Sequence, residues 1–290
     1  MRLDRIISLA LLPPLRLVPG PTVPSRLPVL MYHSISDDNE SGLSPYYRVC
    51  TSPRRFAEHM QWLADWGYSG VTLTRGLAAL HSERPGNGQV GASNPDKLVA
   101  ITFDDGFRDF HTHAFPVLRR HGFAASMYLP TAFIGEERKA FKARECLTWT
   151  EVKQMRSDGM EFGSHTVNHP ELVRLGWPEI EQELRQSKET MEEQLEVPVD
   201  TFAYPYAFPV TDAEFTRRFQ ECLQQSGYTT CATTVIGRVK PGDNPWHLRR
   251  LPVNSIDDHA LFEAKLRGAY DWLAGPQNAV KFLKRFLGRS

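Results

Sequence analysis

Short apolar runs alternate with amphipathic stretches along most of this chain. Runs rich in Val, Ile, Leu and Phe are typical of buried strands and lie near residues 29–32, 68–73, 97–103, 123–129, 160–164, 200–204, 228–233 and 248–253. Apolar residues at helical spacing predict helices near residues 53–66, 107–121, 149–157, 178–195 and 211–226. This alternation, repeated roughly seven or eight times, predicts parallel βα units in one domain.

Polar residues follow the ends of several predicted strands. They are His33, Asp104, Asp105, His165 and Tyr206. In a βα barrel the carboxyl ends of all strands share one face, where active sites lie, so these residues would converge there. We therefore predict a (β/α) barrel of about seven parallel strands in a single domain. An open doubly wound sheet is the alternative fold.

Two adjacent carboxylates, Asp104 and Asp105, end the apolar run at 97–103, and Gly106 follows them. Burying two like charges together is unfavourable unless a cation or a proton resolves the repulsion. This position therefore favours a metal site with one spare carboxylate. A strand followed by an ordinary Asp-Gly turn is the alternative, and this stretch alone does not separate the two.

A pair of histidines, His165 and His169, follows the strand predicted at 160–164. Residues four apart can face one point from a single helical turn or a tight loop. Such a pair alone is often incidental, but two imidazoles and one carboxylate together make a metal site with open positions. Because Asp105 also follows a strand end, we predict that these three side chains hold one divalent ion.

These motifs resemble the polysaccharide deacetylase family, also called the NodB-homology domain or carbohydrate esterase family 4. The resemblance rests on Thr-Phe-Asp-Asp-Gly at 102–106 and, about sixty residues later, Ser-His-x-x-x-His at 164–169. Weaker matches are Phe-Ala-Tyr-Pro-Tyr at 202–206, Leu-Thr-Trp at 147–149 and Val-Leu-Met-Tyr-His-Ser at 29–34. The last of these is similar to the branch that includes deacetylases of bacterial exopolysaccharides. The likeness covers about residues 28–255.

The resemblance implies a distorted (β/α) barrel that hydrolyses N-acetyl groups, or sometimes O-acetyl groups, of sugars. It implies that Asp105, His165 and His169 hold a divalent metal, commonly zinc, and that Asp104 is the general base. It also implies that the backbone N–H of Tyr206 stabilises the oxyanion of the tetrahedral intermediate.

Two aromatic residues in the weaker motifs are candidates for substrate binding. Trp149 and Tyr204 are expected to contact sugar, because aromatic faces stack on sugar rings. The alternatives are a helix-end anchor for Trp149 and an ordinary turn at 204–206.

Two positions depart from the family pattern. The third motif of many members carries an arginine that tethers the catalytic aspartate, whereas Ala203 stands here. Arg249 or Arg250, in a late strand, is expected to supply that charge or to bind substrate, with a solvated pair as the alternative. The family's late Leu-x-x-His motif, whose histidine is the general acid, has no histidine in register. His33 is our candidate acid, with a supporting or core histidine as the alternative, and His247 is less favoured.

Composition sets further limits. The 290 residues include 34 Lys and Arg and 34 Asp and Glu, so the formal net charge is zero and nucleic acid is not an expected partner. The four cysteines form no Cys-x-x-Cys pair. They therefore favour buried thiols over a zinc-thiolate site or a disulfide framework.

We expect an N-terminal extension at 1–27, the barrel at 28–255 and C-terminal helices packed on it at 256–290. Residues 6–12 resemble a signal peptide, but the apolar core is short and prolines follow, so a packed or membrane-touching segment is favoured. The basic amphipathic run at 280–287 is expected to pack on the domain or to contact an anionic membrane. A cytoplasmic or inner-membrane-peripheral location is therefore expected over secretion, and the sequence leaves the oligomeric state open.

The leading hypothesis is a metal-dependent deacetylase of a bacterial polysaccharide or glycoconjugate, with an acetylated carbohydrate as substrate and zinc as the expected ion. One rival is another amide hydrolase on the same scaffold. Another is a carbohydrate-binding protein without turnover. The presence of both Asp104 and Asp105 favours an enzyme, because binding sugar requires no free base.

Overall fold

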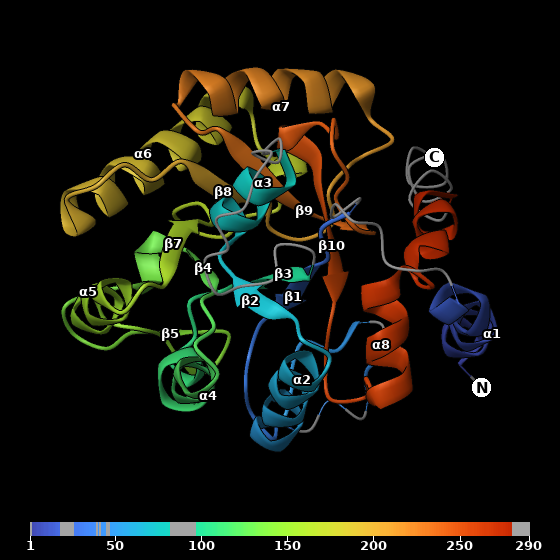
Figure 1. The fold of residues 1–290 in the computed structure, drawn as a ribbon. Helices are drawn as coiled ribbons and strands as arrows, with labels where there is room; N and C mark the ends of the chain where they lie inside the picture. The colour runs from blue at the N-terminus through green and yellow to red at the C-terminus, as the bar shows by residue number, and fades with distance from the viewer. Residues whose placement is uncertain are drawn as a thin grey trace, which may run out of the picture.

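A closed barrel of seven parallel strands forms the centre of the molecule, and helices surround it (Figure 1). The computed structural model describes residues 2–17, 26–38, 40, 42–44, 47–81 and 97–279. The strands around the barrel are, in order, β1 (Val29–Tyr32), β10 (Leu248–Pro252), β9 (Thr230–Ile236), β8 (Thr201–Ala203), β7 (Glu161–Ser164), β4 (Ser126–Leu129) and β3 (Leu98–Phe103). Because β1 pairs with both β10 and β3, the sheet has closed on itself. The predicted barrel is confirmed, and the open sheet is excluded.

One further strand distorts the regular barrel. The short strand β2 (Ser69–Val71) pairs with the first half of β3, with Ser69 opposite Leu98. The pairing of β3 with β4 begins further along, at Thr102 opposite Ser126. All three partners of β3, the strands β1, β2 and β4, are parallel to it, so these strands present their carboxyl ends on the same face.

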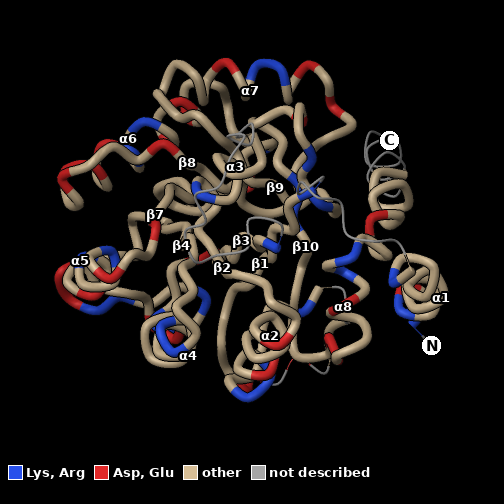
Figure 2. The backbone as a smooth tube through the Cα atoms, viewed as in Figure 1, with Lys and Arg blue, Asp and Glu red and all other residues tan. Residues whose placement is uncertain are grey.

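Helices follow most of the strands, as the alternating pattern predicted. Their bounds are α1 (Leu3–Leu17), α2 (Pro53–Asp65), α3 (Leu73–His81), α4 (Phe115–Arg120), α5 (Trp149–Ser157), α6 (Trp177–Leu195), α7 (Ala213–Gln225) and α8 (His259–Arg267). The predicted capping box is present at α5: Thr148 Oγ1 accepts from the Glu151 N–H, and the Glu151 carboxylate accepts from the Thr148 N–H. Figure 2 shows acidic and basic residues mixed along α5, α6 and α7, in keeping with the zero net charge.

The strands are buried on both faces, as their apolar composition predicted. All side chains of β1, β3 and β4 are buried. The main apolar cluster joins residues of β1 and β3 to α2 and α8 through Tyr32, Phe103, Phe56 and Phe262. All four cysteines are buried and free, as expected.

The N-terminal segment forms helix α1 and lies against α8 (Figure 1). Leu12 of α1 packs on Ala264 and Ala269, while Arg5 pairs with Asp258 at 2.5 Å. Several apolar side chains of α1 remain exposed: Leu3, Ile6, Ile7, Leu11 and Leu17. Among the described residues, no helix has both the length and the apolar character that crossing a membrane requires.

Two regions differ from the sequence expectation, and two others lie outside the described residues. The helix predicted at 107–121 divides into a π-helical turn (Phe110–Ala114) and α4. A small antiparallel hairpin, β5 (Ala140–Phe141) and β6 (Arg144–Glu145), was not predicted. The predicted loop at 83–96 and the basic run at 280–287 lie outside the described residues.

Candidate active site

The acidic pair sits where β3 ends and the backbone turns sharply. Asp104 continues the strand, since its N–H donates to the Tyr32 carbonyl. Asp105 and Gly106 then adopt left-handed φ values of +73° and +67°. This turn lets the two adjacent carboxylates meet different partners, although both are buried with 2 % of their surface exposed. A left-handed φ is tolerated by Asp and is strained for most side chains, so the local geometry itself marks this position.

Asp105, His165 and His169 form one buried cluster, as the sequence predicted for a metal site. One potential ligand atom of each residue lies within 4.8 Å of those of the other two. The Asp105 Oδ1 is 3.0 Å from His169 Nε2 and 3.7 Å from His165 Nε2. Among the described residues, no other group of three or more His, Cys, Asp and Glu side chains is arranged to hold an ion.

The protonation of the cluster suits a cation. His165 Nδ1 lies 2.7 Å from the Ala203 carbonyl and therefore carries the proton, which leaves the Nε2 lone pair facing Asp105. Burial lowers the pKa of His165 to about 3, so this imidazole is neutral. Within the described part of the chain, Asp105 Oδ1 has no hydrogen-bond partner other than the His169 Nε2 that lies 3.0 Å away. A divalent ion such as zinc is coordinated by the lone pairs of carboxylate oxygens and imidazole nitrogens. The residues of this cluster therefore fit the expected metal.

Asp104 has a different partner. Arg250, whose side chain is fully buried, donates from Nη1 and Nη2 to the two oxygens of Asp104, at 2.7 and 2.8 Å. Burial would raise the pKa of Asp104, but the charge and the hydrogen bonds of Arg250 hold it below its ordinary value. The sequence analysis expected Arg249 or Arg250 to tether the catalytic aspartate. In the structure, Arg250 has this position. It lies behind Asp104 rather than among the residues that line the cleft over the site, so this structure does not place it against a substrate.

His33 directly follows β1 and lies near Asp104. Its Nε2 is 3.8 Å from Asp104 Oδ2, and its side chain is partly exposed. Burial lowers the pKa of His33, although Asp104 and Asp105 act in the opposite direction. The imidazole is therefore neutral near pH 7 and within reach of a proton that Asp104 collects.

A deep cleft opens over these groups at the carboxyl ends of the strands. Its volume is about 1090 Å³. It is lined by His33, Asp104, Asp105, His165 and His169, together with residues of the loops after β1, β7, β8 and β10. The cleft therefore gives access from solvent to both carboxylates and both histidines.

The third sequence motif forms one wall of the cleft. Tyr206 is 47 % exposed, has a left-handed φ of +58°, and its ring lies 4.6 Å from that of His169. Thr234 Oγ1 donates to the Tyr206 carbonyl at 3.1 Å and fixes this turn. Tyr204 also lines the cleft, but only 1 % of its surface is exposed, since the ring packs against Phe208. Tyr204 thus shapes the wall more than it offers a face to a sugar.

Two predicted substrate-binding residues lie away from the cleft. Trp149 is the first residue of α5, is 4 % exposed and belongs to the main apolar cluster, so the helix-end anchor describes its position. Arg249 points to the outer surface of β10, where its side chain lies beside Gly237. Neither side chain lines the cleft, so the prediction that Trp149 and Arg249 contact the substrate is corrected.

One residue of the site was missed by sequence reasoning. Lys142, in the turn of the β5–β6 hairpin, donates from Nζ to Asp105 Oδ2 at 3.0 Å. The same ammonium group lies over the rings of Phe141 and Tyr206. Lys142 and Ala143 both have positive φ, the geometry of a tight hairpin turn that usually carries Asn or Gly. No Asn-Gly signal marks this turn, so no local pattern indicated that Lys142 would lie here.

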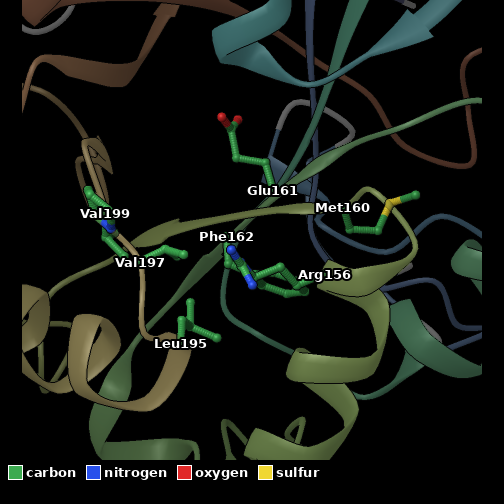
Figure 3. A pocket seen from close by; sticks show the side chains of 8 residues that line it. Arg156, Met160, Glu161, Phe162, Leu195, Val197 and Val199 are labelled. Carbon is green, nitrogen blue, oxygen red and sulfur yellow. The ribbon is translucent and has the colours of Figure 1, made fainter.

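A smaller pocket lies at the opposite end of β7 (Figure 3). It has a volume of about 260 Å³ and is lined by residues such as Glu161, Phe162 and Val199. Glu161 begins β7, whereas His165 follows its last residue, so this pocket is on the amino-terminal side of the barrel. None of the candidate site residues lines this pocket.

Comparisons with known proteins agree with the geometry. Residues 91–231 match the family described as polysaccharide deacetylase. YxkH of Bacillus subtilis (strain 168), named after the same family, is 27 % identical over 231 residues, which cover 80 % of this chain and 72 % of that protein. The poly-β-1,6-N-acetyl-D-glucosamine N-deacetylase of Escherichia coli (strain K12) is 29 % identical over 154 residues, or 48 % of this chain and 20 % of that enzyme.

The fold has a similar counterpart among solved structures. The deacetylase PplD of Streptococcus pyogenes superimposes with a TM-score of 0.69 and 24 % identity, over 84 % of this chain and 99 % of that chain. The matched family region contains both diagnostic motifs, at 102–106 and 164–169, that the sequence resemblance rested on. The barrel, the motifs and the matches lead to one conclusion: residues 91–231, about half of this chain, match the polysaccharide deacetylase family.

Proposed function

We propose that this protein hydrolyses the acetamido group of N-acetylated sugars in a bacterial polysaccharide or glycoconjugate, with a divalent metal, zinc, as its cofactor. The observation that carries the proposal is the arrangement around Asp104 and Asp105. One carboxylate joins two imidazole nitrogens, while the other is ionised, oriented by Arg250 and open to the cleft. The names of the relatives, deacetylases of carbohydrates, support the same chemistry.

Asp105, His165 and His169 are the residues that would hold the ion. Two histidine nitrogens and one carboxylate oxygen form a ligand set typical of catalytic zinc, with positions left open for substrate and water. Such an ion, when bound, supplies Lewis-acid polarisation of an acyl carbonyl and of water. The hydrogen bond from His165 Nδ1 to Ala203 orients the first imidazole for this task.

Asp104 acts as the general base that removes a proton from the attacking water. Its bidentate contact with Arg250 keeps it ionised and fixes its direction, which a positioned base requires. The water oxygen joins the acyl carbon, the C–N bond breaks, and acetate and a free amine result. Arg250 never faces the substrate in this scheme, because it acts through Asp104.

His33 and Tyr206 complete the proposed scheme. Asp104 Oδ2 and His33 Nε2 are 3.8 Å apart, so the proton taken from water can pass to His33 and then to the leaving nitrogen. This route accounts for how an imidazole that is neutral at rest becomes the acid. The backbone N–H of Tyr206, in a turn fixed by Thr234, is the proposed donor to the developing oxyanion.

Acetate release tests the proposal. Zinc-loaded protein is incubated with β-1,6- and β-1,4-linked N-acetylglucosamine oligomers, and the released acetate and the new amines are quantified. The two amounts should be equal. We expect both products from at least one oligomer, and far less of either product from Asp104→Asn. Saturable sugar binding without acetate would instead support a binding protein. Hydrolysis confined to small non-sugar amides would support a different amide hydrolase.

A further inference from the structure

Three basic side chains, Arg48, Lys142 and Arg144, line the cleft together with three acidic ones. Each carboxylate that lines the cleft already has a basic partner within 3.0 Å: Asp104 with Arg250, Asp105 with Lys142, and Glu171 with Arg174. Arg48 also lines the cleft, but among the described residues its guanidinium group pairs with no carboxylate. Its side chain makes one hydrogen bond, from Nε to the Leu43 carbonyl at 3.3 Å.

The loop around Arg48 holds it in place without neutralising it. The nearby Glu40 carboxylate accepts from the backbone N–H groups of Val49 and Cys50, at 3.0 and 2.8 Å, and forms no ion pair with Arg48. The Arg48 carbonyl accepts from Asn254 Nδ2 at 3.2 Å, which ties the loop to the region after β10. The Arg48 backbone is therefore anchored on two sides, whereas no carboxylate in the described part of the chain pairs with its guanidinium group.

The β5–β6 hairpin lies beside this loop and adds two more cations. Arg144 Nη2 lies 3.1 Å from Cys50 Sγ, two residues after Arg48, so the hairpin and the loop form one wall. Arg144 pairs with Asp38, a residue that is largely exposed to screening solvent. Lys142 pairs with Asp105, so a divalent ion held by Asp105 would leave this ammonium without its partner.

The cleft has room for more than the reacting sugar. Its volume of about 1090 Å³ lies above the roughly 300–1000 Å³ of typical small-molecule sites. Tyr47, Val173 and Tyr206 give it exposed apolar surface suited to sugar rings. A neighbouring sugar can therefore enter the cleft together with the acetylated one and meet the basic wall.

Building on the function proposed above, we propose that the substrate carries an anionic group, a carboxylate or a phosphodiester, close to the N-acetylated sugar. The wall formed by Arg48, Lys142 and Arg144 binds this group. A neutral glycan would leave these cations in a partly desolvated cleft without a counter-charge, which disfavours its binding relative to an anionic glycan. Arg48 is the main determinant, because its guanidinium group pairs with no carboxylate of the described residues and offers bidentate geometry to either anion.

The test compares three oligosaccharides of similar length with the zinc-loaded full chain. They are neutral N-acetylglucosamine oligomers, oligomers alternating with a uronic acid, and oligomers joined by phosphodiesters. We expect kcat/KM for at least one anionic series to exceed the neutral value by about tenfold, and the excess to shrink as salt increases. Arg48→Gln should reduce the ratio of anionic to neutral kcat/KM by about fivefold to tenfold.

A matched variant and distinct outcomes separate this inference from the proposed function. Arg54→Gln removes an exposed arginine of α2 outside the cleft and should leave the ratio at the wild-type value. Equal kcat/KM for neutral and anionic oligomers, or an unchanged ratio in Arg48→Gln, would overturn the anionic preference while the deacetylase function stands. Failure to release acetate from any of the three substrates would overturn both.

Discussion

Arg250 donates two hydrogen bonds to the carboxylate of Asp104, although 146 positions separate the two residues in the sequence. Both side chains are buried, so this is an ion pair shielded from solvent at the mouth of the barrel. A further contact, from Arg250 Nε to the Thr233 carbonyl at 3.0 Å, directs the guanidinium group toward the end of β3. The pair joins β10 to β3 across β1 and also orients the proposed base.

Removal of Arg250 is expected to affect both stability and turnover. In Arg250→Met, Asp104 loses its buried counter-charge, so the free energy of unfolding should fall by about 3–5 kcal/mol. Urea unfolding followed by circular dichroism measures this change. The neighbouring exposed residue provides the control, since Arg249→Met should change stability by less than about 0.5 kcal/mol. Equal effects of the two substitutions would contradict the assigned pairing.

The double variant Asp104→Asn/Arg250→Met separates loss of charge balance from loss of packing. Because neither ionised partner remains, the double variant should be more stable than Arg250→Met alone. If its stability equals the sum of the two single losses, the two residues do not interact as described.

The two adjacent aspartates should respond differently to the same substitution. Asp104→Asn removes the proposed base, so kcat should fall on the order of 10²–10⁴-fold while zinc affinity stays close to wild type. Asp105→Asn removes a proposed ligand, so zinc affinity itself should fall. Isothermal titration with zinc and acetate release measure the two effects separately. Loss of zinc binding in Asp104→Asn with normal binding in Asp105→Asn would reverse our assignment.

Lys142 should compete with the metal. Its ammonium group contacts Asp105 at 3.0 Å, so it lies against the carboxylate that would hold the ion, and like charges repel. Lys142→Met is therefore expected to bind zinc about tenfold more tightly in a competition with a chromogenic chelator. Lys139→Met is the matched control, because Lys139 Nζ donates to the Ala132 carbonyl instead. Weaker zinc binding in Lys142→Met would show that the lysine supports the site.

The free energy of unfolding should rise with pH over the range in which His59 is protonated in the unfolded chain but not in the folded one. Burial lowers the pKa of His59 to about 4, while Tyr32 and the Asp257 carbonyl occupy its two ring nitrogens, at 3.1 and 2.9 Å. Between about pH 4 and 6.5 the unfolded chain binds a proton that the folded chain does not, so the folded state loses stability as pH falls through this window. The full effect amounts to roughly 3 kcal/mol.

Equilibrium unfolding at several pH values measures this dependence. His59→Gln should reduce the slope of unfolding free energy against pH between 4 and 6.5, whatever its effect on stability at pH 7. His81→Gln, at an exposed position at the end of α3, should leave the slope at the wild-type value. The same slope in His59→Gln and wild type would exclude His59 as the titrating group.

The barrel and the acidic and histidine motifs were predictable because local patterns encode them. Strands buried on both faces appear as continuous apolar runs, and their carboxyl ends meet by topology alone. Asp105, His165 and His169 could therefore be placed together from the sequence pattern. The relation of this cluster to Arg250 could not be derived in the same way. β10 is irregular in register between Leu248 and Arg250, so the inward-facing arginine was not identifiable from alternation.

Other parts of the site depend on contacts that the sequence does not encode locally. Lys142 reaches Asp105 because a two-residue turn adopts positive φ without Asn or Gly, so neither the hairpin nor the contact had a sequence signal. Trp149 has the residue type suited to a sugar subsite, yet its position at the start of α5 turns it into the core. Side-chain direction after a loop is set by tertiary packing, which a motif alone does not specify.

Titration of the chelator-stripped protein with zinc, followed by acetate release from an N-acetylated oligosaccharide, tests the central claim most directly. Asp105, His165 and His169 should bind one ion per chain, so activity should rise linearly and saturate at one equivalent. His169→Ala should bind zinc more weakly and require a large excess to reach any activity. Full activity in the stripped protein, or zinc bound at one equivalent with unchanged affinity in His169→Ala, would contradict the account.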